Sequence, residues 1–196
     1  SLKNVEVLTD QISCKDARDA FFGNDQIALG ESQITKTVYL KRPFAQLNII
    51  TTDISDIYES EIPGSFLPDA VTLTYQGYTG FNVSTSEVVG NPVTISHTCA
   101  PYASLANTPG VAAWTLTMDY VLTTKATESV AISAKDVVDL NWVVKHGTNQ
   151  ITSMDFSNIP LKRNYRTNIT GALLTNTATY NVEILPGWTG ELNPSI

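Results

Sequence analysis

Alternation of apolar and polar residues runs through most of the chain. The segment 44–51 places Ala45, Leu47 and Ile49 on one side, and the segment 114–124 sets Trp114, Leu116, Met118 and Tyr120 against Thr115, Thr117 and Asp119. A period of two residues is typical of strands with one buried face. The same pattern predicts strands at 1–8, 34–41, 44–51, 70–76, 81–89, 92–98, 114–124, 129–138, 139–147, 151–161, 164–175 and 178–185.

Helical periodicity is confined to two short segments. Ser13 is a candidate N-cap and Gly23 a candidate stop for a helix between them, and a helical turn is expected at 53–60. Strands separated by Gly, Asn and Pro turns, with no helices between them, indicate an all-β fold. An antiparallel β-sandwich with one or two short helices is therefore expected.

Composition narrows the function classes. The net charge is −7 and the sequence pI is about 4.7, so a phosphate backbone would be repelled and no nucleic-acid partner is expected. No apolar run approaches the ~18 residues of a membrane-spanning helix. The two cysteines, Cys14 and Cys99, are interpreted as buried thiols in preference to one bridge in an oxidising compartment.

Candidate chemistry is sparse. Neither His97 nor His146 lies in a recognisable catalytic motif, so no catalytic residue is assigned and the chain is not expected to be an enzyme. His97 and Cys99 share a strand face but supply only two of the four ligands of a structural zinc site. The acidic run from Asp53 to Glu61 suits a solvated helical face better than a calcium loop. We therefore expect no metal and no cofactor.

Two segments carry a family resemblance. KRPFAQLNII, residues 41–50, and IPLKRNYRTNITGALLT, residues 159–175, resemble signature segments of the fimbrillin-like proteins of Bacteroides-type bacteria, which are subunits of surface pili. Weaker matches are spread in order from about residue 2 to residue 193. The resemblance implies a Greek-key, transthyretin-like sandwich. It also implies that residues 1–24 are the end of a preceding N-terminal β-domain with a connecting helix, and that residues 25–196 are the C-terminal sandwich domain.

The same resemblance implies a structural and adhesive role. Family members are made as lipoprotein precursors, are anchored to the outer membrane and lie at the extracellular cell surface or in the fimbrium. The implied partners are other pilus subunits, in a homopolymer or heteropolymer, and a host or bacterial surface protein or glycan. The chain does not begin with Met and shows no export signal, so Ser1 is interpreted either as a processing point or as an artificial boundary, and in an exported protein the signal would have been removed before it.

Assembly in this family proceeds by strand exchange, in which a segment of one subunit fills a groove that proteolysis opens in the next. Alternating residues in two segments are candidates for this exchange: Leu2, Val5 and Val7, and Tyr180, Val182 and Ile184. An ordinary sandwich strand would show the same alternation.

Two alternatives remain. A cell-surface carbohydrate-binding module would use exposed aromatic rings, and Trp188 in the GWTG turn is the first candidate, with Tyr78 and Tyr102 beside it. An enzyme would need a concave pocket in which His97 or His146 faces a carboxylate.

Overall fold

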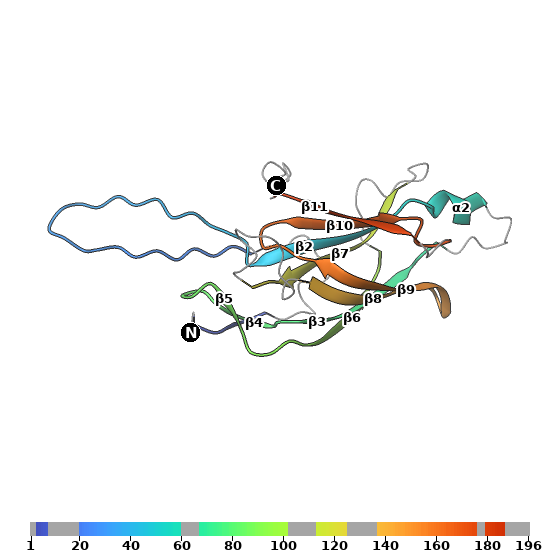
Figure 1. Ribbon diagram of the computed structural model, residues 1–196, viewed down its shortest axis with the longest axis horizontal. Coiled ribbons are helices and arrows are strands. Elements are labelled where there is room, and N and C mark those ends of the chain that lie inside the picture. Colours follow the sequence, from blue (N-terminus) through green and yellow to red (C-terminus); the bar gives the residue numbers. More distant parts are fainter. Residues whose placement is uncertain are drawn as a thin grey trace.

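The protein is an all-β sandwich, as the alternation predicts. The computed structural model describes residues 3–7, 20–59, 67–101, 113–124, 137–175 and 179–186. Eleven strands and one helix are described (Figure 1): β1 (Val5–Glu6), β2 (Phe44–Thr51), α2 (Ile54–Glu59), β3 (Ala70–Gly77), β4 (Gly80–Asn82), β5 (Glu87–Val89), β6 (Val93–Cys99), β7 (Trp114–Leu122), β8 (Val137–His146), β9 (Asn149–Pro160), β10 (Arg166–Gly171) and β11 (Tyr180–Leu185).

The strands form three sheets. One four-stranded sheet has the order β11-β10-β2-β7 and is called here the β2 sheet, and the other has the order β6-β3-β8-β9 and is called the β3 sheet. A small sheet, β1-β4-β5, completes the set. All pairs are antiparallel except β10 with β2, which run parallel, so the β2 sheet is mixed.

The main core lies between the two large sheets. Ala45, Leu47 and Ile49 of β2 are fully buried there, against Trp142 of β8 and Phe156 of β9. Burying side chains of this size is the main source of stability, at about 25 cal/mol per Å² of apolar surface. The predicted inward face of β2 is therefore confirmed.

A second core lies on the other side of β2. Phe44 of β2 and Tyr120 of β7 pack there with Phe22 and Phe81. The small sheet contributes further side chains, so β2 is buried on both faces and not on one.

Strand β7 departs from simple alternation. Its pairing with β2 shifts register between Ile49 and Ile50, so Leu116 faces the main core while Met118 and Tyr120 face the second one. A bulge of this kind inserts an extra residue and turns the side chains that follow to the other face. The expectation of one apolar face from Trp114 to Tyr120 is therefore wrong.

Three further boundaries differ from the predictions. The segment 81–89 is two strands, because the Asn82 side chain accepts hydrogen bonds from the backbone N–H groups of Ser84 and Thr85 and closes a turn. Strand β8 is continuous from Val137 to His146, so no hairpin turn separates the segments predicted at 129–138 and 139–147. Residues 20–22 are not helical, and the rest of the helix expected from Ser13 lies outside the described residues.

The predicted helical turn at 53–60 is confirmed as α2. The strand predicted at 34–41 is wrong. Phe22 and Lys41 exchange two backbone hydrogen bonds of 2.9 Å, and beyond that bridge residues 24–40 run out and back as two extended limbs. Figure 1 shows this segment, called here the arm, projecting from the sandwich along the longest axis of the molecule.

Candidate functional site

Strand β11 lies at one edge of the β2 sheet. It pairs in antiparallel fashion with β10, and within the described part of the chain no strand pairs with its other side. Its residues include Tyr180, Val182 and Ile184, which the sequence marks as candidates for strand exchange. The structure therefore places one predicted segment at an open sheet edge.

Backbone hydrogen bonds show which groups of β11 point outward. The N–H of Gln46 donates to the carbonyl of Tyr165, and the N–H of Thr52 donates to that of Gly171. Both carbonyls belong to odd-numbered residues, and backbone groups along a strand alternate between its two sides. The odd-numbered residues of β10 thus point toward β2, and its even-numbered residues point toward β11.

The register between β10 and β11 then fixes the direction in which the backbone groups of β11 point. Its odd-numbered residues pair with the even-numbered residues of β10, as Glu183 does with Asn168. Their backbone groups point inward to the sheet. The even-numbered residues Tyr180, Val182 and Ile184 therefore direct their N–H and C=O groups to the open side. Unpaired groups of this kind form a template for another strand.

The side chains of the same three residues face the sandwich. The Tyr180 ring meets the Phe156 ring of β9 edge-on, with centroids 5.0 Å apart, and Val182 packs against the main core. Asn181 and Glu183 are exposed on the opposite face. The strand is therefore held in place by its side chains, while no described strand pairs with its outer backbone groups.

The N-terminal candidates are arranged differently. Val5 pairs with Phe81 in the small sheet, and the N–H of Val7 donates to the carbonyl of Thr79 over 2.7 Å. Val7 also packs against the second core. Leu2 lies outside the described residues.

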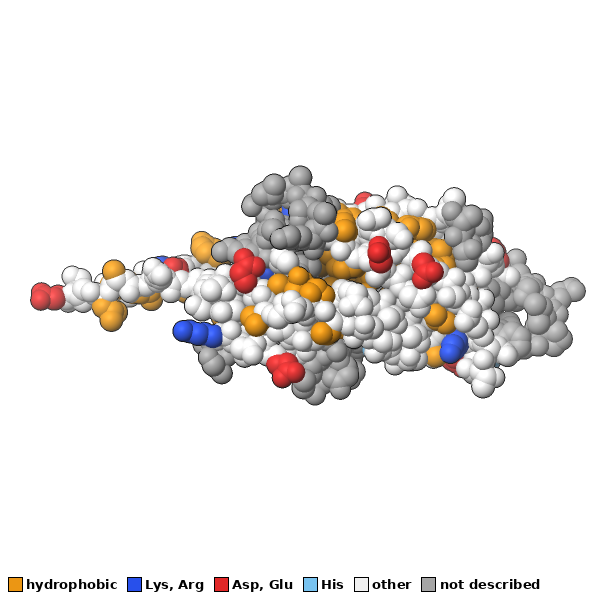
Figure 2. Space-filling model, turned by 60° about the horizontal axis from the view of Figure 1, so that its bottom comes forward, with side chains coloured by type: hydrophobic (Ala, Val, Ile, Leu, Met, Phe, Trp, Pro, Cys, Tyr) orange, Lys and Arg blue, Asp and Glu red, His pale blue; other side chains and the backbone are white. Residues whose placement is uncertain are grey.

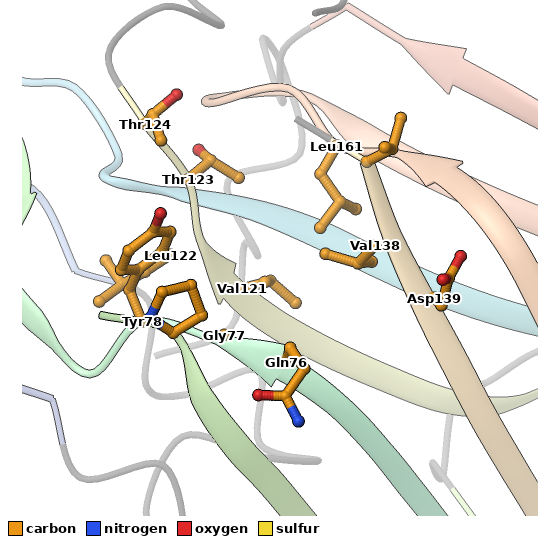
Figure 3. Close-up of a pocket in the computed structure, with 12 residues that line it drawn as sticks. Gln76, Gly77, Tyr78, Val121, Leu122, Thr123, Thr124, Val138, Asp139 and Leu161 are labelled. Carbon is orange, nitrogen blue, oxygen red and sulfur yellow. The ribbon is translucent and has the colours of Figure 1, made fainter. Parts of the chain in front are cut away.

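One candidate for sugar binding lies in a cleft. Tyr78 lines a cleft of about 270 Å³ between the ends of β3, β7 and β8, together with Gln76, Leu122 and Asp139. Figure 3 shows these side chains around the opening. Trp188 and Tyr102 lie outside the described residues.

Both histidines approach a carboxylate, yet neither lines this cleft. The Nε2 atom of His97 lies 3.4 Å from Asp119 Oδ2 in the interior, and Asp119 also accepts a 3.2 Å hydrogen bond from the Tyr75 hydroxyl. Burial lowers the pKa of His97. Burial, followed by the charge of Asp119 and the hydrogen bond to it, raises the pKa of Tyr75. This cluster links the two sheets.

His146 lies near the surface. Its Nδ1 atom is 2.8 Å from the Leu67 carbonyl and 3.8 Å from Asp69 Oδ2. Within the described ranges, no group of three or more His, Cys, Asp or Glu side chains gathers in a way that suits a metal ion. The described helix is also too short and polar to cross a membrane.

The acidic run is not a uniformly solvated face. Asp53 is buried, and its carboxylate accepts hydrogen bonds from the backbone N–H groups of Leu174 and Thr175 at 3.0 and 2.7 Å. It is a structural anchor between α2 and the turn after β10. Sequence analysis missed this role because the partners are 121 and 122 residues away.

The cysteine interpretation is also corrected. Cys99 is disulfide-bonded and is not a free thiol. Cys14 is the only other cysteine in the sequence, and it lies outside the described residues. Protein disulfides are found mainly outside the reducing cytosol.

These features define an all-β sandwich protein with an open strand edge. The chain belongs to a family of unknown function, DUF6562, whose model matches residues 1–195. No curated protein matches it.

Two solved structures show distant likeness. A protein from Bacteroides uniformis described as a "putative cell adhesion protein" matches 78% of this chain and 53% of its own, with 12% identity and a TM-score of 0.38. A Bacteroides fragilis protein with the same description matches 85% of this chain and 53% of its own, with 12% identity and a TM-score of 0.36. The chain thus spans about half the length of these proteins, and similarity of this extent assigns it no function.

Proposed function

We propose that this protein is a structural and adhesive subunit of a bacterial surface pilus that assembles by β-strand exchange. The observation that carries the proposal is the open edge of β11, where Tyr180, Val182 and Ile184 direct backbone groups outward. A strand from another subunit would complete the sheet by β-augmentation. The partners are then other copies of the subunit or related pilus proteins.

The physical chemistry of such an edge favours a long-lived contact. Each added backbone hydrogen bond contributes only about 0.5–1.5 kcal/mol net. Several bonds along one six-residue strand add up, and an incoming strand would also bury side chains on the two sheet faces. A polymer joined in this way needs no covalent link between its subunits.

Two further observations support a place at the cell surface, with anchoring to the outer membrane as part of the proposal. The disulfide at Cys99 fits an oxidising, extracytoplasmic compartment. The two segments that resemble those of pilus subunits also correspond to neighbouring strands of the β2 sheet. The first segment contains most of β2 and the second contains β10. Division of the chain into the end of one domain, residues 1–24, and a second domain, residues 25–196, belongs to the same proposal.

The test uses native full-length protein from the cell surface. Electron microscopy would show whether the protein forms filaments, and N-terminal sequencing of the same sample would show whether assembled subunits are trimmed. Filaments of trimmed subunits are expected. An untrimmed monomer on the membrane would overturn the proposal.

A matched pair of variants tests the edge itself. Ile184→Pro removes an N–H that points to the open side and leaves the bonds between β10 and β11 intact. Ile184→Ala loses comparable side-chain contact but keeps the N–H. We expect the proline variant to fold and fail to polymerise while the alanine variant polymerises. Equal polymerisation by both variants would show that the β11 edge is not the contact.

One observation favours a second function, carbohydrate binding at the cell surface. The cleft beside Tyr78 combines an aromatic ring with the amide of Gln76 and the carboxylate of Asp139, which are groups that bind sugar hydroxyls. Glycan-array binding that is lost in Tyr78→Ala would support this function. Binding that persists in that variant, or no binding at all, would remove the cleft from consideration.

A further inference from the structure

The arm, residues 24–40, exposes several large apolar side chains to solvent. Leu29 is 93% exposed, Tyr39 79% and Leu40 64%. Ile27, Ile34 and Val38 are also about half exposed. Figure 2 shows hydrophobic side chains spaced along a thin projection, away from the body of the protein. Apolar residues gathered on one exposed element indicate an interaction site.

The backbone groups of the arm also make few hydrogen bonds among the described residues. At its base, Phe22 and Lys41 exchange two hydrogen bonds, and between described residues no backbone-to-backbone hydrogen bond involves positions 24–40. The limbs are steadied instead by Lys36, whose ammonium lies 2.6 Å from the Asp25 carboxylate and donates to the Gln26 carbonyl. A long extended stretch therefore offers unpaired N–H and C=O groups to a partner.

The side chains of each limb follow the period of a strand. Ile27 and Leu29 share a side of the outgoing limb, and Ile34, Val38 and Leu40 share a side of the returning limb. Alternation explains why the sequence predicts a strand at 34–41, although among the described residues this segment pairs only through the bridge between Lys41 and Phe22. The pattern is that of a strand whose partner is on another molecule.

The open edge of β11 is a suitable partner. A limb of about eight residues spans roughly 26 Å at 3.3 Å per residue, which is enough to cover a strand the length of β11. The arm extends along the longest axis of the molecule, and in Figure 1 β11 runs along a similar direction. The arm also points away from its own β11, so it can reach that edge only on a second copy.

We propose that the arm is the donor strand of the subunit and that it pairs with the open edge of β11 on a second copy of the chain. This inference rests on the proposed function and names the donor strand that the proposed function leaves unassigned. Because arm and edge are different surfaces, the contact is head-to-tail. A head-to-tail contact that does not close on itself produces a filament.

The first test shortens the arm in the full-length protein. Residues 25–38 are replaced by Asn-Gly, which keeps the bridge between Phe22 and Lys41 in register across a two-residue turn. A second variant keeps the length and combines Leu29→Asn with Tyr39→Asn. Val93→Asn, at a half-exposed apolar residue of β6, is the matched control. We expect both arm variants to keep the melting temperature of the native protein and to lose about tenfold or more of the polymer, while the control polymerises normally.

The second test identifies the surface that the arm meets. A photo-crosslinking amino acid replaces Leu29 in the native chain, filaments are irradiated, and the linked peptides are identified by mass spectrometry. Links to the peptide that contains residues 180–185 are expected. Links to any other peptide of the subunit would overturn the assignment of β11 as the acceptor.

The outcomes separate this inference from the proposed function. If the native protein and the arm variants polymerise equally, the pilus function stands and the arm is not the donor. If the native protein forms no polymer, including after its N-terminal segment is removed, both ideas fail. A folded arm variant that stays monomeric beside a polymerising native protein supports both.

Discussion

The imidazole of His97 lies 3.4 Å from the carboxylate of Asp119, in the interior between two sheets. His97 comes from β6 of the β3 sheet and Asp119 from β7 of the β2 sheet. The Tyr75 hydroxyl, from β3, completes the cluster by donating to the same carboxylate. A polar contact therefore ties the two layers together at the side of the sandwich where β6 and β7 form the edges.

Stability is expected to fall in mild acid because of His97. Burial holds its folded-state pKa below the ordinary value of 6.5, so the unfolded chain takes up the proton first. The contribution is fully present above pH 6.5 and is lost as the pH falls from there toward the folded-state pKa. Its slope is at most about 1.4 kcal/mol per pH unit.

Urea denaturation between pH 8 and pH 5 measures this effect. His97→Asn is expected to flatten the dependence. The same pH dependence in native protein and in His97→Asn would show that another group is responsible.

The Tyr75 hydroxyl is expected to stabilise the fold through its hydrogen bond. Tyr75→Phe removes the donor and leaves the buried Asp119 carboxylate with one partner fewer. Loss of a hydrogen bond to a charged group costs about 1.5–3 kcal/mol. Chemical denaturation measures the loss, and Tyr39→Phe, at an exposed ring of the arm, is the control. Equal stability of both variants would mean that the 3.2 Å contact adds nothing.

How far the sequence could predict the fold is shown by two strands with the same kind of pattern. The segment 44–51 is a strand with the predicted bounds. Pro43 marks its start, and the alternating residues Ala45, Leu47 and Ile49 are buried in the main core. The segment 34–41 alternates as clearly, yet in the described part of the chain only its last residue, Lys41, pairs with another segment, at Phe22. Alternation reports that a face can be buried, and it does not report which molecule covers it.

The candidate site was predictable in part for the same reason. Tyr180, Val182 and Ile184 could be chosen from alternation, but their place at an edge depends on the order of strands in the sheet. The anchoring role of Asp53 depends on partners more than a hundred positions away. Long-range contacts of this kind leave no local pattern in a single sequence.

Arg163 is expected to be essential for stability. Its side chain is 1% exposed, and its guanidinium donates to the carbonyls of Ser86, at 2.8 Å, and Thr123. It also lies 5.4 Å from the centre of the Phe81 ring. The planar fork reaches both carbonyls at once, and a lysine ammonium does not.

Thermal and chemical denaturation of Arg163→Lys test this expectation. Leaving buried carbonyls unpaired should cost about 2–4 kcal/mol. Lys162→Arg, at the neighbouring partly exposed position, makes the reverse exchange and should change stability little. A native-like Arg163→Lys would show that charge alone matters at this position.

The disulfide at Cys99 is expected to contribute a large part of the protein's free energy of unfolding. With Cys14 as the only other cysteine, the bond would close a long loop that includes the arm and β2. Closing a loop of this length restricts the unfolded chain and contributes about 4 kcal/mol. We expect no reactive thiol in denatured, unreduced protein, and a clear fall in melting temperature after reduction. Cys14→Ser with Cys99→Ser should match the reduced protein and not respond to reductant. Two reactive thiols in freshly isolated protein would contradict the bond, and an unchanged melting temperature after complete reduction would contradict its stabilising role.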